Sequence, residues 1–297
     1  MNAIISRTSL FKKRKRQSSK KPPLGSSSFL TQKSVSDTFD DQQESAASEH
    51  QRRRELECIL HLVEGCRLAN IPASSSMIFR FACYYNFDYE VSRSALLQRF
   101  DDPHLHLRME GEMIKQFQNL VLFPLPGLRT KNNHQEVLYF HACRHFPAET
   151  DTEVLINNMC YVFNDMSLSQ EQCRNGVALL IDLNQWTFKN FTPECANKFL
   201  KAMQHQVPTK LATILIVNGP RWFPKVYRCV FKKMLSTTLV KKVHIIKQSK
   251  YLQDYLMDGY GKYLPLEMSR GGQNSSEILE DYMDRKIYEE SSNYSMG

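Results

Sequence analysis

The sequence GVALLIDLNQW at residues 176–186, followed by LATILIVNGPRWF at residues 211–223, decides the fold of this chain. Each segment begins with a short, largely apolar run, at residues 177–183 and 211–217, and then turns polar. Apolar runs of this length are typical of strands that are buried on both faces of a sheet. The sequence predicts two further strands, one before these segments at residues 137–141 and one after them at residues 243–246.

Helical patterns separate these strands. We expect helices at residues 152–166, 193–203 and 223–234, each lying between two of the predicted strands. Strands that alternate with helices favour a mostly parallel sheet with helices packed on it. The fold class is therefore predicted to be α/β.

A helical region precedes the sheet. From Arg52 onward, apolar side chains recur at intervals of three and four residues, which places them on one face of a helix: Leu56, Ile59, Leu60, Val63 and Cys66. Further amphipathic stretches cover residues 77–85, 89–100 and 110–121. Pro124, Pro126 and Gly127 are expected to end this all-helical subdomain, which we place at residues 51–128.

Two polar tails complete the predicted organisation. Residues 1–50 are rich in Ser, Lys, Gln and Asp without periodicity, so a disordered basic tail is expected. The sheet domain is placed at residues 132–272, and residues 273–297 are expected to form a polar tail in which residues 278–288 are at most a transient helix.

The charge balance points to an anionic partner. The 297 residues carry a net charge of +8 and a sequence pI near 9.0, which suits nucleic acid or acidic lipid headgroups. The basic run KKRKR, from Lys12 to Arg16, is interpreted as a nuclear import signal, a contact for anionic lipid, or a solvated tail. Apolar runs stay far below the ~18 residues that span a bilayer, so membrane contact is expected to be peripheral.

Catalytic and metal-binding patterns are absent from the sequence. The eight cysteines form no Cys-x-x-Cys pair, which indicates reduced cytosolic thiols. No Gly-x-Ser-x-Gly, Walker, kinase or dinucleotide-binding pattern occurs, so we expect neither an enzyme nor a cofactor. His141, Cys143 and His145 would share one face of an extended strand, but a structural turn is favoured over a metal site there.

Several segments in the same order resemble one known family. IFRFACYYNFD at residues 78–88 is similar to the "LLRFLRARKFD" helix-turn of CRAL-TRIO lipid-binding proteins. HACRHFP at residues 141–147 resembles the family's Arg-x-Phe-Pro-like turn. ILIVNGPRWF at residues 214–223 resembles the family's "ININAP-x-x-F" segment. YLPLEM at residues 263–268 resembles its "LP-x-E-x-GG" ending. The resemblance covers about residues 52–272. The members of the family that the chain resembles include phosphatidylinositol/phosphatidylcholine transfer proteins and alpha-tocopherol transfer protein.

The resemblance implies an apolar lipid pocket between the sheet and a movable helix, at about residues 227–242. The alternation of β-strands leaves open which strand positions line the pocket and which support helices. The side chains expected to contact lipid are Tyr139, Leu179, Ile181, Leu215, Val217, Phe223, Val230, Phe231, Met234, Leu239 and Lys242.

The headgroup pattern of the family is only partly present. Lys242 aligns with a lysine that phosphoinositide-binding members use, whereas Thr209 and Leu239 replace the family's glutamate and threonine. The ligand is therefore left open among a phospholipid, a sterol and an isoprenoid.

The sequence as a whole predicts a monomeric, cytoplasmic, peripherally membrane-associated protein that transfers one lipid. The alternative is a lipid-sensing module that presents its ligand to a protein partner without transferring it. Nucleic-acid binding through the basic tail ranks below both, because the charge lies outside any recognised nucleic-acid-binding fold.

Overall fold

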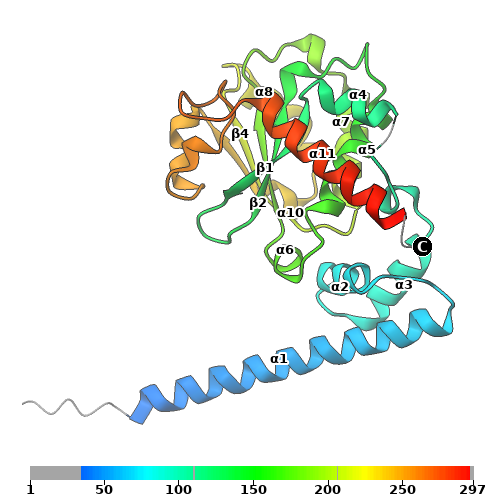
Figure 1. The fold of residues 1–297 in the computed structure, drawn as a ribbon. Helices are drawn as coiled ribbons and strands as arrows, with labels where there is room; N and C mark the ends of the chain where they lie inside the picture. The colour runs from blue at the N-terminus through cyan, green and yellow to red at the C-terminus, as the bar shows by residue number, and fades with distance from the viewer. Residues whose placement is uncertain (1–34, 110, 206, 295–297) are drawn as a thin grey trace, which may run out of the picture. The chain divides into compact units, whose positions relative to one another are not determined.

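The computed structural model describes residues 35–109, 111–205 and 207–294, and contacts divide the chain into a unit up to Ser48 and a second unit from Glu49 (Figure 1). The predicted import signal at residues 12–16 lies outside the described residues. Helix α1 (Val35–Leu68) begins well before Arg52, so the prediction of disorder is wrong for residues 35–50. Extending a helix that has already nucleated costs less than starting one, and the Gln, Glu and Ala residues in this stretch favour extension.

A five-stranded sheet forms the centre of the second unit, and its strands lie in sequence order: β1 (Leu122–Arg129), β2 (Glu136–His141), β3 (Val177–Asp182), β4 (Leu211–Val217) and β5 (Val243–Ile246). Only β1 runs antiparallel to its neighbour, and the remaining pairs are parallel. The predicted α/β class and mostly parallel sheet are confirmed.

Strand β1 corrects one predicted boundary. Residues 122–129 form an edge strand in which Pro124 pairs with Leu138 of β2, so Pro124, Pro126 and Gly127 do not end a helical part. An edge strand tolerates proline because one of its sides needs no backbone donor. The sheet domain therefore starts before residue 132.

The connections between parallel strands all lie on one side of the sheet. These connections are α5 (Thr152–Asp165) and α6 (Gln170–Asn175), then α7 (Pro193–His205), and then a series of short helices between β4 and β5. When strands follow one another in order, right-handed crossovers place every connection on the same face. Leu155 of α5 and Phe199 of α7 accordingly face the same strand residues, and the Phe140 and Phe199 rings stack at 5.3 Å.

The opposite face is covered by the chain that follows β5. Leu252 of η5 (Ser249–Asp254), Leu256 and Leu264 are fully buried, and the Tyr255 ring packs on His244 of β5 at 4.9 Å. Helix α11 (Ser275–Tyr294) then packs against β1 and α4 (Glu112–Gln118), and Figure 1 shows it crossing in front of β1.

The expectation of a polar C-terminal tail is therefore wrong. Helix α11 buries a narrow apolar stripe made of Ile278, Leu279, Tyr282 and Met283. These four positions are outnumbered by charged and polar residues, which is why the segment resembles a tail when its composition alone is considered. The helix is stable because this stripe packs on the core, not because of its own propensity.

The N-terminal helices form a smaller core of their own. Helices α2 (Ser75–Tyr84) and α3 (Tyr89–Arg99) pack on α1 through Cys58, Leu62 and Cys66. Of the residues predicted to share one face of α1, Cys66 is buried, whereas Leu56, Leu60 and Val63 are 57%, 57% and 45% exposed. Both stripes are apolar, so periodicity alone could not decide between them.

Replacing Leu279 with alanine tests the structural role of α11. Because the side chain is buried, we expect the free energy of unfolding to fall by about 3 kcal/mol, measured by urea denaturation. Ile287→Ala, at an exposed position of the same helix, is the control and should change stability little. Equal effects of the two substitutions would contradict the packing of α11 on the core.

Candidate ligand-binding cavity

A cavity of about 120 Å³ lies between the sheet and its crossover helices. The strands contribute aliphatic and aromatic side chains from paired positions on one face: Phe140, Ile181, Ile214, Ile216 and Val243. Helix α7 contributes Cys195, Ala196, Phe199, Leu200 and Met203 to the wall that faces them. Among the described residues that line the cavity, none is an aspartate, glutamate, lysine or arginine.

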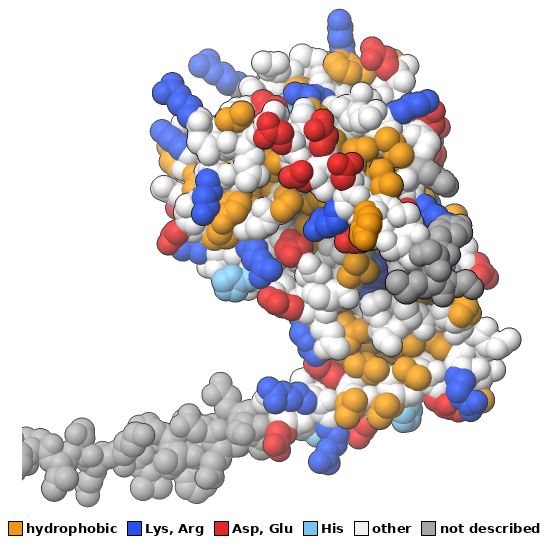
Figure 2. All heavy atoms as spheres, in the orientation of Figure 1, with side chains coloured by type: hydrophobic (Ala, Val, Ile, Leu, Met, Phe, Trp, Pro, Cys, Tyr) orange, Lys and Arg blue, Asp and Glu red, His pale blue; other side chains and the backbone are white. Residues whose placement is uncertain are grey.

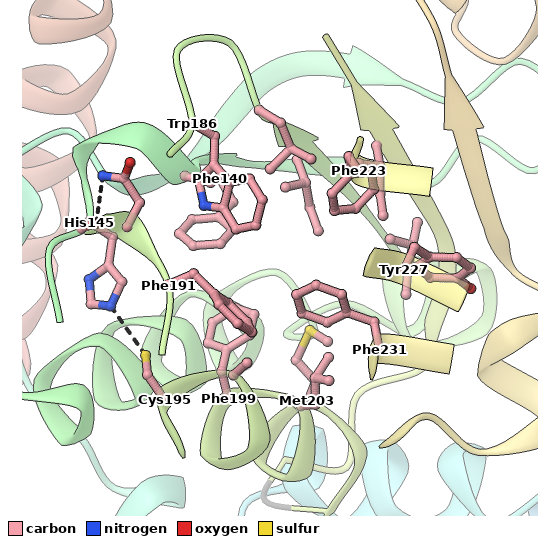
Figure 3. Close-up of a pocket in the computed structure, with 18 of the residues that line it drawn as sticks. Phe140, His145, Trp186, Phe191, Cys195, Phe199, Met203, Phe223, Tyr227 and Phe231 are labelled. Atoms are coloured by element: carbon pink, nitrogen blue, oxygen red, sulfur yellow. Dashed lines mark hydrogen bonds between the residues drawn. The ribbon is translucent and has the colours of Figure 1, made fainter. Parts of the chain in front are cut away.

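Aromatic side chains close the remaining side of the cavity (Figure 3). The rings of Phe191 and Phe231 lie 5.4 Å apart, and the ring of Phe223 lies 5.9 Å from Trp186 and 6.1 Å from Phe231. Phe223 and Phe231 belong to a segment, here called the gate segment, of four short helices: α8 (Phe223–Val226), the π-helix η4 (Tyr227–Phe231), α9 (Lys232–Met234) and α10 (Thr237–Val240).

One end of the cavity is polar but uncharged. The His145 Nε2 and Cys195 Sγ atoms lie 3.2 Å apart, and both residues are buried. Asn190 Nδ2 donates to the backbone oxygens of Cys143 and His145, which holds the turn in place. Burial lowers the pKa of His145 to about 4, and burial raises the pKa of the Cys195 thiol. The pair is therefore a neutral imidazole beside a neutral thiol, which does not match an activated cysteine nucleophile.

Three of the predicted lipid contacts line the cavity: Ile181, Phe223 and Phe231. Leu179 shares the strand face of Ile181 but lies outside the lining. Tyr139, Leu215 and Val217 are buried in the opposite face of the sheet. There the Tyr139 hydroxyl donates to Asp182 Oδ2 at 3.2 Å.

The other predicted contacts lie in or after the gate segment and do not line the cavity. Val230 is half-buried, Met234 packs against the edge of the core, and Leu239 is buried. Lys242 donates from Nζ to the backbone oxygen of Leu211 at 2.8 Å, and burial lowers the pKa of Lys242.

Most residues of the cavity wall were not predicted from the sequence. Phe199, Leu200 and Met203 recur at helical spacing on α7, and this amphipathic pattern could have identified that wall. On β4 the lining positions are Ile214 and Ile216, one residue away from the predicted Leu215 and Val217. Because both faces of β4 are largely apolar, no polar position marks the register.

His141, Cys143 and His145 do not come together as one group but take part in two separate pairs. His141 Nε2 contacts Cys143 Sγ at 3.2 Å, while His145 contacts Cys195 instead. Within the described part of the chain, no group of three metal-binding side chains comes together. Likewise, none of its described helices combines the length and apolar character that crossing a membrane requires.

The site is thus an apolar cavity between a mostly parallel sheet and its crossover helices. Comparison with known families agrees, because the model of the CRAL/TRIO domain matches residues 123–261. Residues 123–261 therefore match a CRAL/TRIO domain, which is the domain of a lipid-binding family.

Individual relatives match only in part. The tyrosine-protein phosphatases non-receptor type 9 of Mus musculus and Homo sapiens are each 24% identical over 137 residues, which is 45% of this chain and 23% of the relative. The chain thus matches less than a quarter of the length of these relatives. The crystal structure of Sfh5 aligns with a TM-score of 0.50 and 17% identity, covering 72% of this chain and 81% of that one, and supports the fold alone.

The buried His145 should make stability depend on pH. Its pKa is about 4 in the folded chain against an ordinary 6.5, so the unfolded chain takes up the proton first as the pH falls. The contribution is complete above pH 6.5 and is lost progressively toward pH 4. Between pH 7 and pH 4.5 we expect His145 alone to lower the free energy of unfolding by about 2 kcal/mol.

Urea denaturation of the wild type and of His145→Leu at these two pH values measures this loss. The leucine variant should lose correspondingly less stability on acidification. An unchanged pH dependence would show that His145 is not held neutral by burial.

Proposed function

We propose that this chain binds one hydrophobic or amphipathic lipid in the cavity and carries or presents it between membranes. The observation that supports the proposal most directly is the cavity wall, which is apolar and free of charged side chains among the described residues. Burying a lipid chain is worth ~0.8 kcal/mol per CH₂ group, so a chain of about sixteen carbons needs a sealed apolar site to leave a bilayer.

The cavity must widen to accept such a ligand. An engineered apolar cavity of about 150 Å³ admits only a molecule the size of benzene, and the cavity here measures about 120 Å³. The gate segment is the element suited to move, because it consists of short helices interrupted by a π-helical turn. Outward movement of Phe223 and Phe231 would open the cavity to the surface.

The surface near the gate segment has the features of a membrane-docking site. Phe188 is 67% exposed and stacks on Trp222 at 4.6 Å, beside the cavity-lining Trp186. Exposed basic side chains accompany these rings: Lys189, Arg221, Lys225, Arg228, Lys232 and Lys233. Aromatic rings and cations together suit the headgroup region of an anionic bilayer.

A second surface, which is acidic, would orient the protein as it approaches a membrane. Helix α11, which contacts the opposite edge strand β1, exposes Glu277, Glu280, Asp281 and Asp284, and Figure 2 shows acidic side chains gathered over it. An anionic bilayer repels this surface and attracts the basic surface beside the gate segment. The charge distribution therefore favours docking with the gate segment toward the membrane.

Filling the cavity should abolish lipid binding. Ala196 lines the cavity from α7, whereas the adjacent Asn197 is exposed. We expect Ala196→Trp to reduce capture of labelled lipids from liposomes by about tenfold, because the indole occupies the ligand's space. Asn197→Trp adds the same side chain on the outer surface and should bind as the wild type does.

Thermal melting should show that both tryptophan variants fold. Loss of capture in both variants, or in neither, would count against the cavity as the lipid site. Capture without exchange between liposomes would indicate a protein that presents its lipid rather than one that transfers it.

Removing the exposed ring should weaken membrane docking. We expect Phe188→Ser to reduce cosedimentation with phosphatidylserine-containing liposomes by about fivefold. Leu168→Ser is the control, because Leu168 is 55% exposed but lies between α5 and α6, away from the gate segment. If the two substitutions weaken cosedimentation equally, the proposed docking surface is wrong.

A further inference from the structure

The charges around the cavity limit what kind of ligand can enter it. The lining contains no formally charged side chain among the described residues, and His145 is neutral because its pKa lies near 4. Lys242 is directed to the backbone oxygen of Leu211 and is not part of the lining. A phosphate drawn into the cavity would therefore find no counter-charge there, and a buried unpaired charge is strongly disfavoured.

Most polar groups in the wall already have partners. Asn190 Nδ2 donates to two backbone oxygens, and its Oδ1 accepts from the Thr187 amide at 2.9 Å. Thr192 Oγ1 accepts from the Cys195 amide at 3.1 Å. These side chains shape the wall, and their hydrogen bonds leave them little capacity for a ligand.

Among the described residues of this wall, His145 is the one with a buried polar atom that has no hydrogen-bond partner. Its side chain is buried, its Nε2 lies within hydrogen-bond distance of the Cys195 thiol, and its Nδ1 has no hydrogen-bond partner in the part of the chain that the structure describes. A thiol is a weak hydrogen-bonding group, and buried polar atoms without a partner are uncommon enough in native structures to require an explanation. A ligand group that bonds to the ring better than the thiol does would provide one.

We propose that the ligand is an uncharged lipid alcohol whose single hydroxyl group binds at the His145–Cys195 pair, with its apolar body along the aromatic wall. This inference rests on the proposed lipid-binding function. A neutral imidazole has one donor and one acceptor nitrogen, and a hydroxyl group can serve either of them. A phospholipid could be held only with its phosphate outside, near the exposed lysines of the gate segment.

Matched ligands distinguish a lipid alcohol bound inside the cavity from a phospholipid whose phosphate stays outside. Hexadecanol, hexadecane and hexadecyl phosphate share one chain and differ only at the end, and cholestanol, cholestane and cholestanyl phosphate repeat the comparison on a ring system. The full chain is incubated with vesicles that contain equal amounts of each series and is then isolated. Mass spectrometry of the extracted lipid measures what each molecule of protein retains.

In at least one series, we expect the alcohol to be retained about fivefold over the hydrocarbon, the difference that one net hydrogen bond makes, with the phosphate at background. His145→Leu should reduce the alcohol to the level of the hydrocarbon, while His145→Gln should restore part of the preference. His141→Leu is the matched control, because His141 makes the same contact with Cys143 outside the cavity.

The outcomes distinguish the two levels of the proposal. Retention of the phosphate as well as the alcohol, or an alcohol preference that survives His145→Leu, would overturn the inference while leaving lipid binding intact. Retention of none of the six compounds would overturn the proposed function and the inference together.

Discussion

Four parallel strands in sequence order, each joined to the next by a right-handed crossover, must place all their connections on one face of the sheet. In this domain Leu155, Phe199 and Phe231 come from three successive connections and line the same cavity. The opposite face would be exposed without the chain that follows β5, which buries it with Leu252, Leu256 and Leu264. The cavity and the C-terminal covering are thus two consequences of one topology.

The same arrangement explains the chemistry of the cavity. A space between an apolar sheet face and apolar helices has a low dielectric constant, so an ionised group there loses hydration without gaining a partner. This cost keeps His145 neutral and disfavours the thiolate of Cys195. A cysteine next to a histidine, which in a solvated and electropositive setting would indicate a nucleophile, is here a weakly polar end of an apolar cavity.

The sequence patterns were informative wherever one physical signal dominated. Strands β3, β4 and β5 were predicted within a residue of their observed ends, because short apolar runs bounded by polar turns have few other interpretations. For the opposite reason, strand β1 was missed and helix α11 was expected only as a transient helix at residues 278–288. Pro124 and Pro126 signal a turn unless the strand lies at an edge, and the stripe of α11 is too narrow to outweigh its charged residues.

By itself, the sequence determined the α/β class, the order of the strands and helices, and the resemblance to a lipid-binding family. The tertiary structure decided which apolar side chains face the cavity. Ile216 lines it and Val217 does not, although both are aliphatic residues of one strand. A strand buried on both sides has no polar face, so only the packing of helices on one side and the C-terminal chain on the other distinguishes its two faces.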